Sequence, residues 1–353
     1  MRILITGGAG FVGSALACRF RRDGAEEVHV LDNLRRRGSE LNLPILKSEG
    51  VVFHHGDIRV RTDIEDVSGA FDLVVDAAAE PSVLAGINAH ADYLIQTNLL
   101  GTVNALEFAR ARGSSFLFIS TSRVYSVAPL RELSLEETPT RVELTADQVL
   151  SGASARGIAE EFPTHLARSL YGATKLASEM LVQEYVQAYG LKAVINRCGV
   201  IAGPGQFGKV DQGVFTLWVA NHYFGKSLTY TGFGGTGKQV RDLLHPDDLF
   251  RLIRMQLDKP EAWTGAITNV GGGRQCSTSL LELTSLCREI TGREVPIGKV
   301  AETKPVDIPL YVTDGAMAER SFGWVPQLGV KDIVEDIHAW IQDNDGSLKG
   351  IFG

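Results

Sequence analysis

The chain has 353 residues, enough for a large hydrophobic core and, by its length, for two lobes. Its net charge of −7 is spread without a long basic block, which argues against a nucleic-acid partner because phosphate binding requires clustered Lys and Arg. The four cysteines show neither a CxxC pair nor a metal-ligand spacing, so we expect buried, reduced thiols, no metal site and a reducing cytoplasm.

The N-terminus predicts a strand, a glycine-rich turn and a helix. The strand ends at Thr6 and the helix begins near Phe11, with Gly7, Gly10 and Gly13 between and within them. These glycines let the backbone turn sharply and approach a pyrophosphate, whose charge then lies on the helix N-terminus. The segment superficially resembles a signal peptide, but the same glycines interrupt its apolar run. No other segment approaches the roughly 20 apolar residues of a membrane span.

The next apolar run closes on Asp32, which completes a dinucleotide-binding fingerprint. A carboxylate there accepts hydrogen bonds from the adenosine ribose hydroxyls and repels a 2′-phosphate, so the sequence favours NAD over NADP. The basic run Arg35-Arg36-Arg37 is the one contrary sign.

Short β-branched runs alternate with amphipathic stretches between Val28 and Asn196. The runs that predict strands are Val28 to Leu31, Val51 to His55, Leu73 to Ala77, Phe116 to Ser120 and Ala193 to Asn196. This alternation predicts an α/β, Rossmann-type doubly wound parallel sheet covered by helices on both faces, with ligands at the carboxyl ends of the strands.

From about Gly199 the pattern loosens into Gly- and Pro-rich loops, which indicates a smaller C-terminal substrate-binding lobe. We therefore expect a nucleotide-binding domain over residues 1–198, completed by part of 236–258, and a substrate lobe over 199–353. A helix from about Ser277 to Thr291 has an apolar spacing typical of core packing.

Tyr171 and Lys175 stand one helical turn apart in the sequence Tyr-Gly-Ala-Thr-Lys. Alone, such a pair is consistent with two surface residues. Together with the dinucleotide fingerprint and the Ser120 to Ser122 run at a strand end, it indicates a catalytic pair. An unperturbed phenol has a pKa of about 10, so a neighbouring ammonium is needed to stabilise the phenolate for base catalysis near neutral pH.

At this point the chain resembles the extended short-chain dehydrogenases/reductases, which modify sugars attached to nucleoside diphosphates. The motifs that carry the resemblance are TGGAGFVG, Asp32-Asn33, His55 to Arg59, Asn98 with Gly101-Thr102, Thr121 with Val124-Tyr125, and Tyr171 with Lys175. The resemblance implies that Asp57 and Ile58 bracket the adenine and that Thr121 hydrogen-bonds the reacting sugar hydroxyl. The residues expected to bind the cofactor are Gly7, Gly10, Phe11, Val12, Gly13, Asp32, Asn33, Asp57, Ile58, Ala77, Ala78, Ala79, Asn98, Tyr171 and Lys175.

Later segments are similar to the CDP-paratose 2-epimerase (CDP-tyvelose epimerase) branch. The first of these segments is Asn33-Leu34, followed by a basic pair and Gly38. The others are Glu136 to Arg141, Gln206-Phe207, Asp211-Gln212-Gly213 and Gly237 to Asp242. The resemblance implies that Arg241 grips the substrate diphosphate, that Gln206 and the Asp211-Gln212 loop lie near the nucleotide or sugar, and that Asp307 belongs to a substrate-contacting segment. Ordinary surface salt bridges and a polar loop are the alternative.

The residues after Thr121 separate this branch from similar enzymes. Nucleotide-sugar 4,6-dehydratases carry Asp-Glu there, and related decarboxylases keep a Glu at the second position, whereas this chain has Ser122-Arg123. Both activities are therefore disfavoured. Arg123 is either a solvated charge or a substrate contact. Gly199, Ala202 and Pro309 also depart from the residues common among relatives, which leaves the nucleotide and the sugar open.

These features predict an NAD-dependent epimerase that inverts C2 of a CDP-linked dideoxyhexose by transient oxidation. Tyr171 takes the hydroxyl proton, hydride passes to the nicotinamide, Thr121 and Lys175 hold the keto-sugar, and the hydride returns to the other face. The alternatives are a UDP-sugar 4-epimerase and a non-catalytic NAD(P)-sensing protein of the same fold, while Asp32 disfavours a simple NADPH-dependent reductase. We expect a homo-oligomer with no membrane partner.

Overall fold

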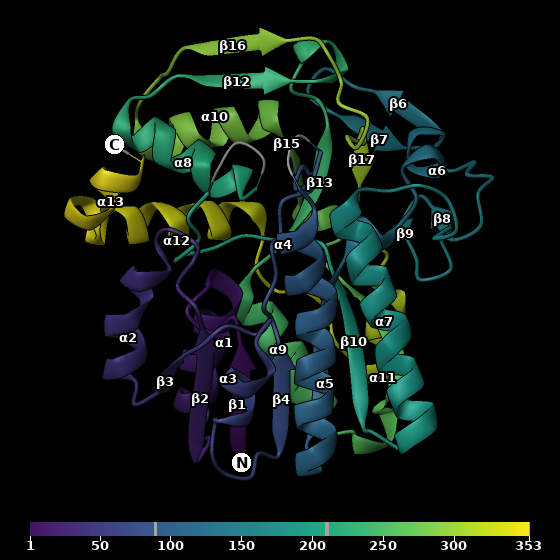
Figure 1. The fold of residues 1–353 in the computed structure, drawn as a ribbon. Helices are drawn as coiled ribbons and strands as arrows, with labels where there is room; N and C mark the ends of the chain where they lie inside the picture. The colour runs from purple at the N-terminus through teal and green to yellow at the C-terminus, as the bar shows by residue number, and fades with distance from the viewer. Residues whose placement is uncertain (88–89, 209–211, 353) are drawn as a thin grey trace. The chain divides into compact units, whose positions relative to one another are not determined.

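The computed structural model describes residues 1–87, 90–208 and 212–352. The chain divides into two compact units, and each is described by itself (Figure 1). The first unit comprises Met1–Val124, Ser169–Arg197 and Phe250–Thr268, and the second comprises Tyr125–Arg168, Cys198–Leu249 and Asn269–Gly353.

This division differs from the expected boundary at residue 198. Residues 125–168 belong to the second unit because their backbone bonds to it: Val142 N–H donates to Lys238 O at 3.1 Å, and Ile158 N–H donates to Val312 O at 2.8 Å. Residues 250–268 belong to the first unit, beyond the expected 236–258, because they include most of the strand at one edge of its sheet.

The first unit is built on a seven-stranded sheet with the strand order β14, β10, β5, β4, β1, β2, β3. Its strands are β1 (Arg2–Thr6), β2 (Glu27–Asp32), β3 (Val52–His55), β4 (Leu73–Asp76), β5 (Ser115–Thr121), β10 (Ala193–Cys198) and β14 (Thr264–Val270). The pairs β1–β2, β1–β4, β2–β3 and β4–β5 are parallel. The strand order reverses between β1 and β4, which is where such sheets bind ligands.

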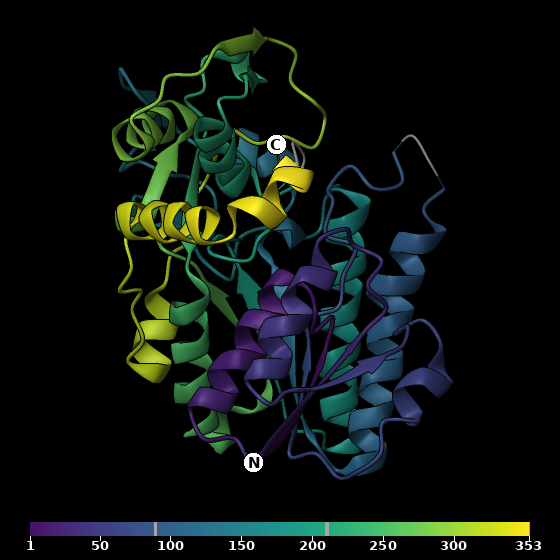
Figure 2. The same cartoon turned by 90° about the vertical axis from the view of Figure 1, so that its left-hand side faces the viewer.

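Helices cover both faces of this sheet, as the doubly wound prediction requires. They are α1 (Phe11–Arg22), α2 (Leu43–Ser48), α3 (Arg61–Glu65), α4 (Asp92–Ile95), α5 (Gly101–Arg112), α7 (Leu170–Tyr189) and α9 (Pro246–Leu257). Helices α5 and α7 lie on one face, and α1 lies with α9 on the other, where the rings of Phe20 and Phe250 meet at 5.0 Å (Figures 1 and 2). The central strands β1, β4 and β5 are mostly apolar because both of their faces are buried.

Short segments complete the first unit. They are the 3-10 turns Ser39–Asn42, Ser122–Val124 and Pro260–Ala262, and the π-helical segment Gln96–Leu100 between α4 and α5. The turn Ser122–Val124 follows β5 directly and packs against α7.

The second unit combines short strands with a helical layer. Its strands are β6 (Leu135–Glu137), β7 (Val142–Leu144), β8 (Ala153–Ser154), β9 (Gly157–Ile158), β11 (Val200–Ile201), β12 (Leu228–Thr231), β13 (Val240–Leu244), β15 (Ser277–Ser279), β16 (Ile297–Val300) and β17 (Leu310–Tyr311). Its helices are α6 (Val127–Arg131), α8 (Val214–Phe224), α10 (Leu280–Thr291), α11 (Ala316–Phe322), α12 (Val330–Asp343) and α13 (Asp345–Phe352), and its 3-10 turns are Phe233–Gly235 and Arg274–Cys276. Helix α8 packs against α10, α12 and α13 around an apolar core.

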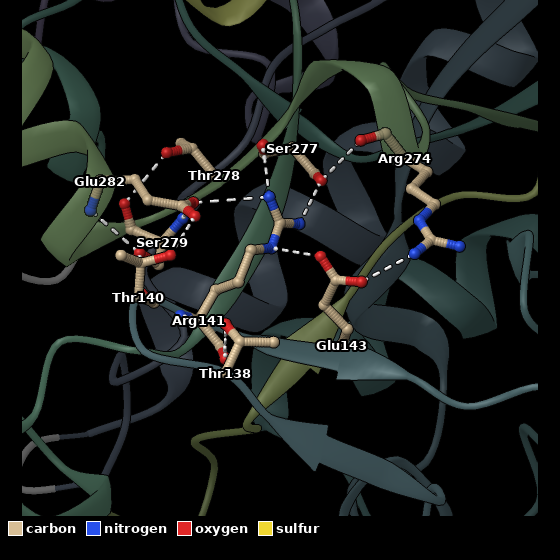
Figure 3. A network of polar contacts seen from close by, with 9 residues as sticks. All are labelled: Thr138, Thr140, Arg141, Glu143, Arg274, Ser277, Thr278, Ser279 and Glu282. Carbon is tan, nitrogen blue, oxygen red and sulfur yellow. Dashed lines mark hydrogen bonds and ion pairs between the residues drawn. The ribbon is translucent and has the colours of Figure 1, made fainter.

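Arg141 joins the β6–β7 hairpin to the segment that begins α10 (Figure 3). Its guanidinium donates to Ser277 Oγ at 2.6 Å, to Ser277 O at 3.2 Å and to Glu282 Oε2 at 3.4 Å. Ser279 caps α10 and exchanges hydrogen bonds with Glu282, so the helix begins at Leu280. The expected start at Ser277 is wrong, because residues 277–279 pair with β13 as a strand.

All four cysteines are buried and free of disulfides, as expected. Across residues 1–87, 90–208 and 212–352, no helix combines the length and the apolar character that crossing a bilayer requires. Within the same ranges, His, Cys, Asp and Glu side chains form no cluster of three or more suited to a metal ion.

Candidate active site

The glycine-rich turn after β1 leaves no room for a side chain at Gly7 or Gly13. Gly7 has a φ of +63°, and a Cβ on it would come within 2.7 Å of Ala78 Cα. A Cβ on Gly13 would lie 2.3 Å from Gly7 O. Helix α1 begins here with Gly10 at its N-cap, which has no side chain to bond the first-turn amides. Phe11 and Val12 form that first turn, so the arrangement suits a pyrophosphate bound to backbone N–H groups.

Asp32 lies at the carboxyl end of β2, and its carboxylate is oriented by two backbone amides. Ala9 N–H donates to Oδ2 at 3.0 Å, and Leu34 N–H donates to Oδ1 at 2.8 Å. Burial raises the pKa of Asp32, while these amide hydrogen bonds act to lower it. A carboxylate fixed in this way at the end of the second strand suits the two adenosine ribose hydroxyls.

Asp57 follows β3 and is held within a polar cluster. Arg59 donates to both of its carboxylate oxygens, at 2.9 and 2.6 Å, and Asn33 Nδ2 donates to Oδ2 at 2.9 Å. The hydrogen bond from Arg59 is the main cause that lowers the pKa of Asp57 to about 2.

Arg35 is the first residue of the basic run that stood against a preference for NAD. It lies over the Tyr93 ring, with its Cζ 4.1 Å from the ring centroid.

The segment after β4 lies against the glycine turn. Ala78 N–H donates to Thr6 Oγ1 at 3.2 Å. The Thr6 hydroxyl donates in turn to Asp76 at 2.6 Å, and Thr102 donates to the same carboxylate at 2.7 Å. Asp76 therefore joins the ends of β1 and β4 to the start of α5, and the predicted cofactor segment Ala77 to Ala79 follows it directly. No sequence motif indicated Asp76 as a site residue; its position immediately before that segment was the available signal.

Asn98 connects the same region to α7. Its Oδ1 accepts Glu80 N–H at 2.7 Å, and its Nδ2 donates to Thr174 Oγ1 at 3.2 Å. Ser178 on α7 donates to Asn98 O at 2.9 Å. These contacts fix the π-helical segment against the helix that carries Tyr171.

Helix α7 places Tyr171 in its first turn. Ser169 caps the helix by accepting Gly172 N–H at 3.1 Å. One turn later Lys175 is 2% exposed, and its Nζ lies 3.8 Å from the ring centroid of Phe118 on β5. A buried ammonium on the same helical face as a phenol suits stabilisation of the phenolate.

Thr121 ends β5, the strand that packs against α7. Its side chain is buried, and Oγ1 accepts the N–H of Arg123 at 3.2 Å. Arg123 lies half-buried in the following turn. The structure thus gathers Thr121, Tyr171, Lys175 and the predicted cofactor residues in the first unit, around the carboxyl ends of its strands.

The other predicted substrate residues lie in the second unit. Arg241 donates to Val240 O and to Ile308 O, each at 2.7 Å, which places its guanidinium beside the segment that contains Asp307. Arg131 supports this segment by donating to Asp307 O at 2.9 Å.

Gln206 is buried and makes hydrogen bonds within its own unit. It accepts the Thr216 hydroxyl at 2.6 Å and donates to Ile201 O at 3.0 Å. Gln212 is half-buried, and Asp211 lies outside the described residues.

A family model described as "NAD dependent epimerase/dehydratase family" matches residues 3–271. The chain belongs to this family. NAD is the family's cofactor, and the tightly packed glycine turn and the amide-bound Asp32 carboxylate suit a pyrophosphate and a ribose.

The relatives of this chain differ from one another in their named activities. This chain is 30% identical to the CDP-paratose 2-epimerase of Salmonella typhi over 350 residues, which cover 96% of this chain and 99% of the relative. DesIV, a dTDP-glucose 4,6-dehydratase from Streptomyces venezuelae solved with NAD, is 29% identical with a TM-score of 0.78, covering 99% of this chain and 100% of that one. The UDP-glucose 4-epimerase of Thermus thermophilus, solved in complex with NAD, is 26% identical with a TM-score of 0.74, and the match covers 97% of this chain and 99% of that one.

Proposed function

We propose that this member of the family is an epimerase of a nucleoside-diphosphate sugar, and that it inverts C2 of a CDP-linked dideoxyhexose. The observation that carries the epimerase assignment is the end of β5: Thr121 is followed by Ser122 and Arg123, neither of which has a carboxyl group. The 30% identity to a CDP-paratose 2-epimerase supports the choice of C2 and of a CDP-sugar. Elimination of water needs an acid and a base beside the sugar, whereas inversion by oxidation and reduction needs only one proton-transfer group.

The residues then act as follows. Tyr171 accepts the proton of the sugar hydroxyl as the carbon is oxidised, and it returns the proton when the ketone is reduced. Lys175 stabilises the phenolate, and Thr121 donates a hydrogen bond to the reacting oxygen. NAD supplies the hydride acceptor and, once reduced, the hydride donor.

The second unit supplies proposed substrate ligands. We assign Arg241 to the diphosphate because a guanidinium suits phosphate oxygens and its orientation is set by two backbone carbonyls. Gln206, Gln212 and Asp307 are proposed near the nucleotide or sugar, and Arg123 of the first unit is proposed as a further substrate contact.

Two experiments test the function. Purified protein is incubated separately with CDP-, UDP- and dTDP-linked hexoses and dideoxyhexoses, and the products are followed by NMR. We expect inversion at C2 of a CDP-sugar without added NAD. Inversion at C4 of a UDP-sugar would instead support the 4-epimerase alternative, loss of water would support a dehydratase, and unchanged sugars throughout would support a sensor.

The second experiment runs the reaction in deuterated water. Direct hydride return predicts no deuterium at the inverted carbon. Substantial incorporation there would contradict the mechanism and favour enolisation.

A further inference from the structure

Two pairs of side chains connect strand β5 to helix α7. Phe118 and Ser120 lie on the same face of β5, because side chains alternate along a strand. Lys175 and Glu179 lie one turn apart on α7. Phe118 receives the Lys175 ammonium on its ring at 3.8 Å, and Ser120 Oγ–H donates to Glu179 Oε1.

Glu179 is itself fixed from a third element. Arg197 on β10 donates from Nε to both Glu179 oxygens at 3.1 Å, and from Nη2 to Oε2 at 2.7 Å. The Glu179 and Arg197 side chains are only 1% and 6% exposed. A charge pair this deeply buried is a costly way to stabilise a core, since apolar residues of similar volume often serve as well. The pair does, however, restrict its carboxylate to one position, where it accepts the Ser120 hydroxyl.

The position of this contact links it to the chemistry. Ser120 directly precedes Thr121, and Glu179 follows Lys175 on the face that also carries Tyr171. We propose that Glu179, held by Arg197, is a positioning residue that fixes the carboxyl end of β5, and with it Thr121, relative to the Tyr171–Lys175 helix. The inference rests on the proposed function for its kinetic consequence. A displacement of about 1 Å at a reacting group can lower a rate roughly a hundredfold.

The test compares two serines that lose the same atom at opposite ends of one strand. Ser120→Ala removes the hydroxyl bonded to Glu179 and leaves the Arg197 pair intact. Ser114→Ala is the matched control: Ser114 is also buried, precedes β5 at its amino end, and donates to Phe71 O at 2.6 Å. Both variants should lower the Tm similarly.

Only Ser120→Ala should impair turnover, with kcat roughly a hundredfold lower and KM within about twofold of wild type, because positioning affects the reacting atoms more than ground-state binding. Equal kcat in the two variants, or a change confined to KM, would overturn the proposal.

A double variant separates positioning from stability. Glu179→Met alone removes the carboxylate that the buried Arg197 guanidinium contacts and should destabilise strongly, whereas Glu179→Met with Arg197→Met should recover most of the lost Tm. The kcat of the double variant should stay low, since neither Met accepts the Ser120 hydroxyl. Recovery of wild-type kcat together with Tm would assign the pair a purely structural role and refute the inference.

Crystal structures provide a readout that does not depend on the substrate. In Ser120→Ala, Thr121 should shift relative to Lys175 by about 1 Å, while in Ser114→Ala it should not. An unmoved Thr121 refutes the positioning role even if the wild type inverts its sugar. A displaced Thr121 in a protein whose wild type inverts no sugar upholds the positioning role and overturns the proposed function.

Discussion

At the scale of single residues, the proposed chemistry depends on a phenol and an ammonium on one helix. Tyr171 lies in the first turn of α7, close to the capping Ser169, and Lys175 is buried one turn later against Phe118. An ammonium kept away from solvent interacts more strongly with a nearby phenolate than an exposed one would, because the surrounding dielectric is lower. The tyrosine hydroxyl is therefore the group whose removal most directly tests the proposal.

Tyr171→Phe should lower kcat by at least about a hundredfold while leaving the content of bound NAD and the Tm near wild type, because it removes a proton-transfer group and almost no volume. Tyr185→Phe is the matched control on the same helix. Tyr185 donates to Glu107 at 2.5 Å, and burial with this contact raises its pKa to about 12. Turnover assays and quantification of released NAD should separate the two; wild-type kcat in Tyr171→Phe would refute the mechanism.

At the scale of elements, β13 organises the small sheet of the second unit. It pairs with β11, β15 and β17, and Asp242 in its centre accepts Gly273 N–H and Thr313 N–H, each at 3.1 Å. A carboxylate that accepts hydrogen bonds from the backbone amides of two neighbouring loops holds these loops against the strand. Its full burial also makes it costly to ionise, and desolvation raises the pKa of Asp242 to about 6.

This raised pKa predicts a pH-dependent stability. An acid whose folded pKa exceeds its unfolded value binds its proton more tightly when folded, so the free energy of unfolding falls as the pH rises from about 4 through 6. A folded pKa about 2 above the unfolded value corresponds to about 3 kcal/mol in the free energy of unfolding. Asp242→Asn keeps an acceptor for the two amides and does not titrate.

Urea unfolding of wild type and Asp242→Asn at pH about 4 and about 7 measures the effect. From the lower to the higher pH, the free energy of unfolding of Asp242→Asn should rise by about 3 kcal/mol relative to that of the wild type. A difference between the proteins that does not change with pH would show that Asp242 does not titrate in this range.

At the scale of the whole molecule, the cofactor is expected to contribute to stability, because a ligand that binds only the folded state stabilises it by mass action. At a concentration 100 times Kd this contribution is about 2.7 kcal/mol. An epimerase that regenerates its own NAD has no need to release it, so the purified protein should retain the cofactor.

Gly13→Ala should abolish this contribution. The added Cβ would lie 2.3 Å from Gly7 O and 2.7 Å from Gly8 Cα, so the backbone of the turn must move. Retained NAD should fall at least about tenfold, and added NAD should no longer raise the Tm.

Gly346→Ala is the control, because a Cβ there meets no atom within 4 Å. NAD released on denaturation and Tm with and without NAD are the measurements. A Gly13→Ala protein that still copurifies with NAD would contradict the assignment of the turn.

The sequence alone was sufficient for features whose cause is local. The turn from Thr6 to Gly13 depends on missing side chains, and the Tyr171–Lys175 pair depends on helical spacing, so both could be predicted from nearby residues. The apolar runs predicted the parallel sheet because strands buried on both faces need apolar residues throughout.

Tertiary structure decided what depends on residues distant in the chain. Residues 125–168 join the second unit through backbone bonds to Lys238 and Val312, which no local pattern in the segment specifies. The hydrogen bonds of the Gln206 amide to Thr216 and Ile201 also depend on the fold, while its proximity to the substrate stays a prediction. The contacts among Ser120, Glu179 and Arg197 likewise form only when two strands and a helix pack, because hydrogen bonds and ion pairs act over a few ångströms in space, irrespective of separation along the chain.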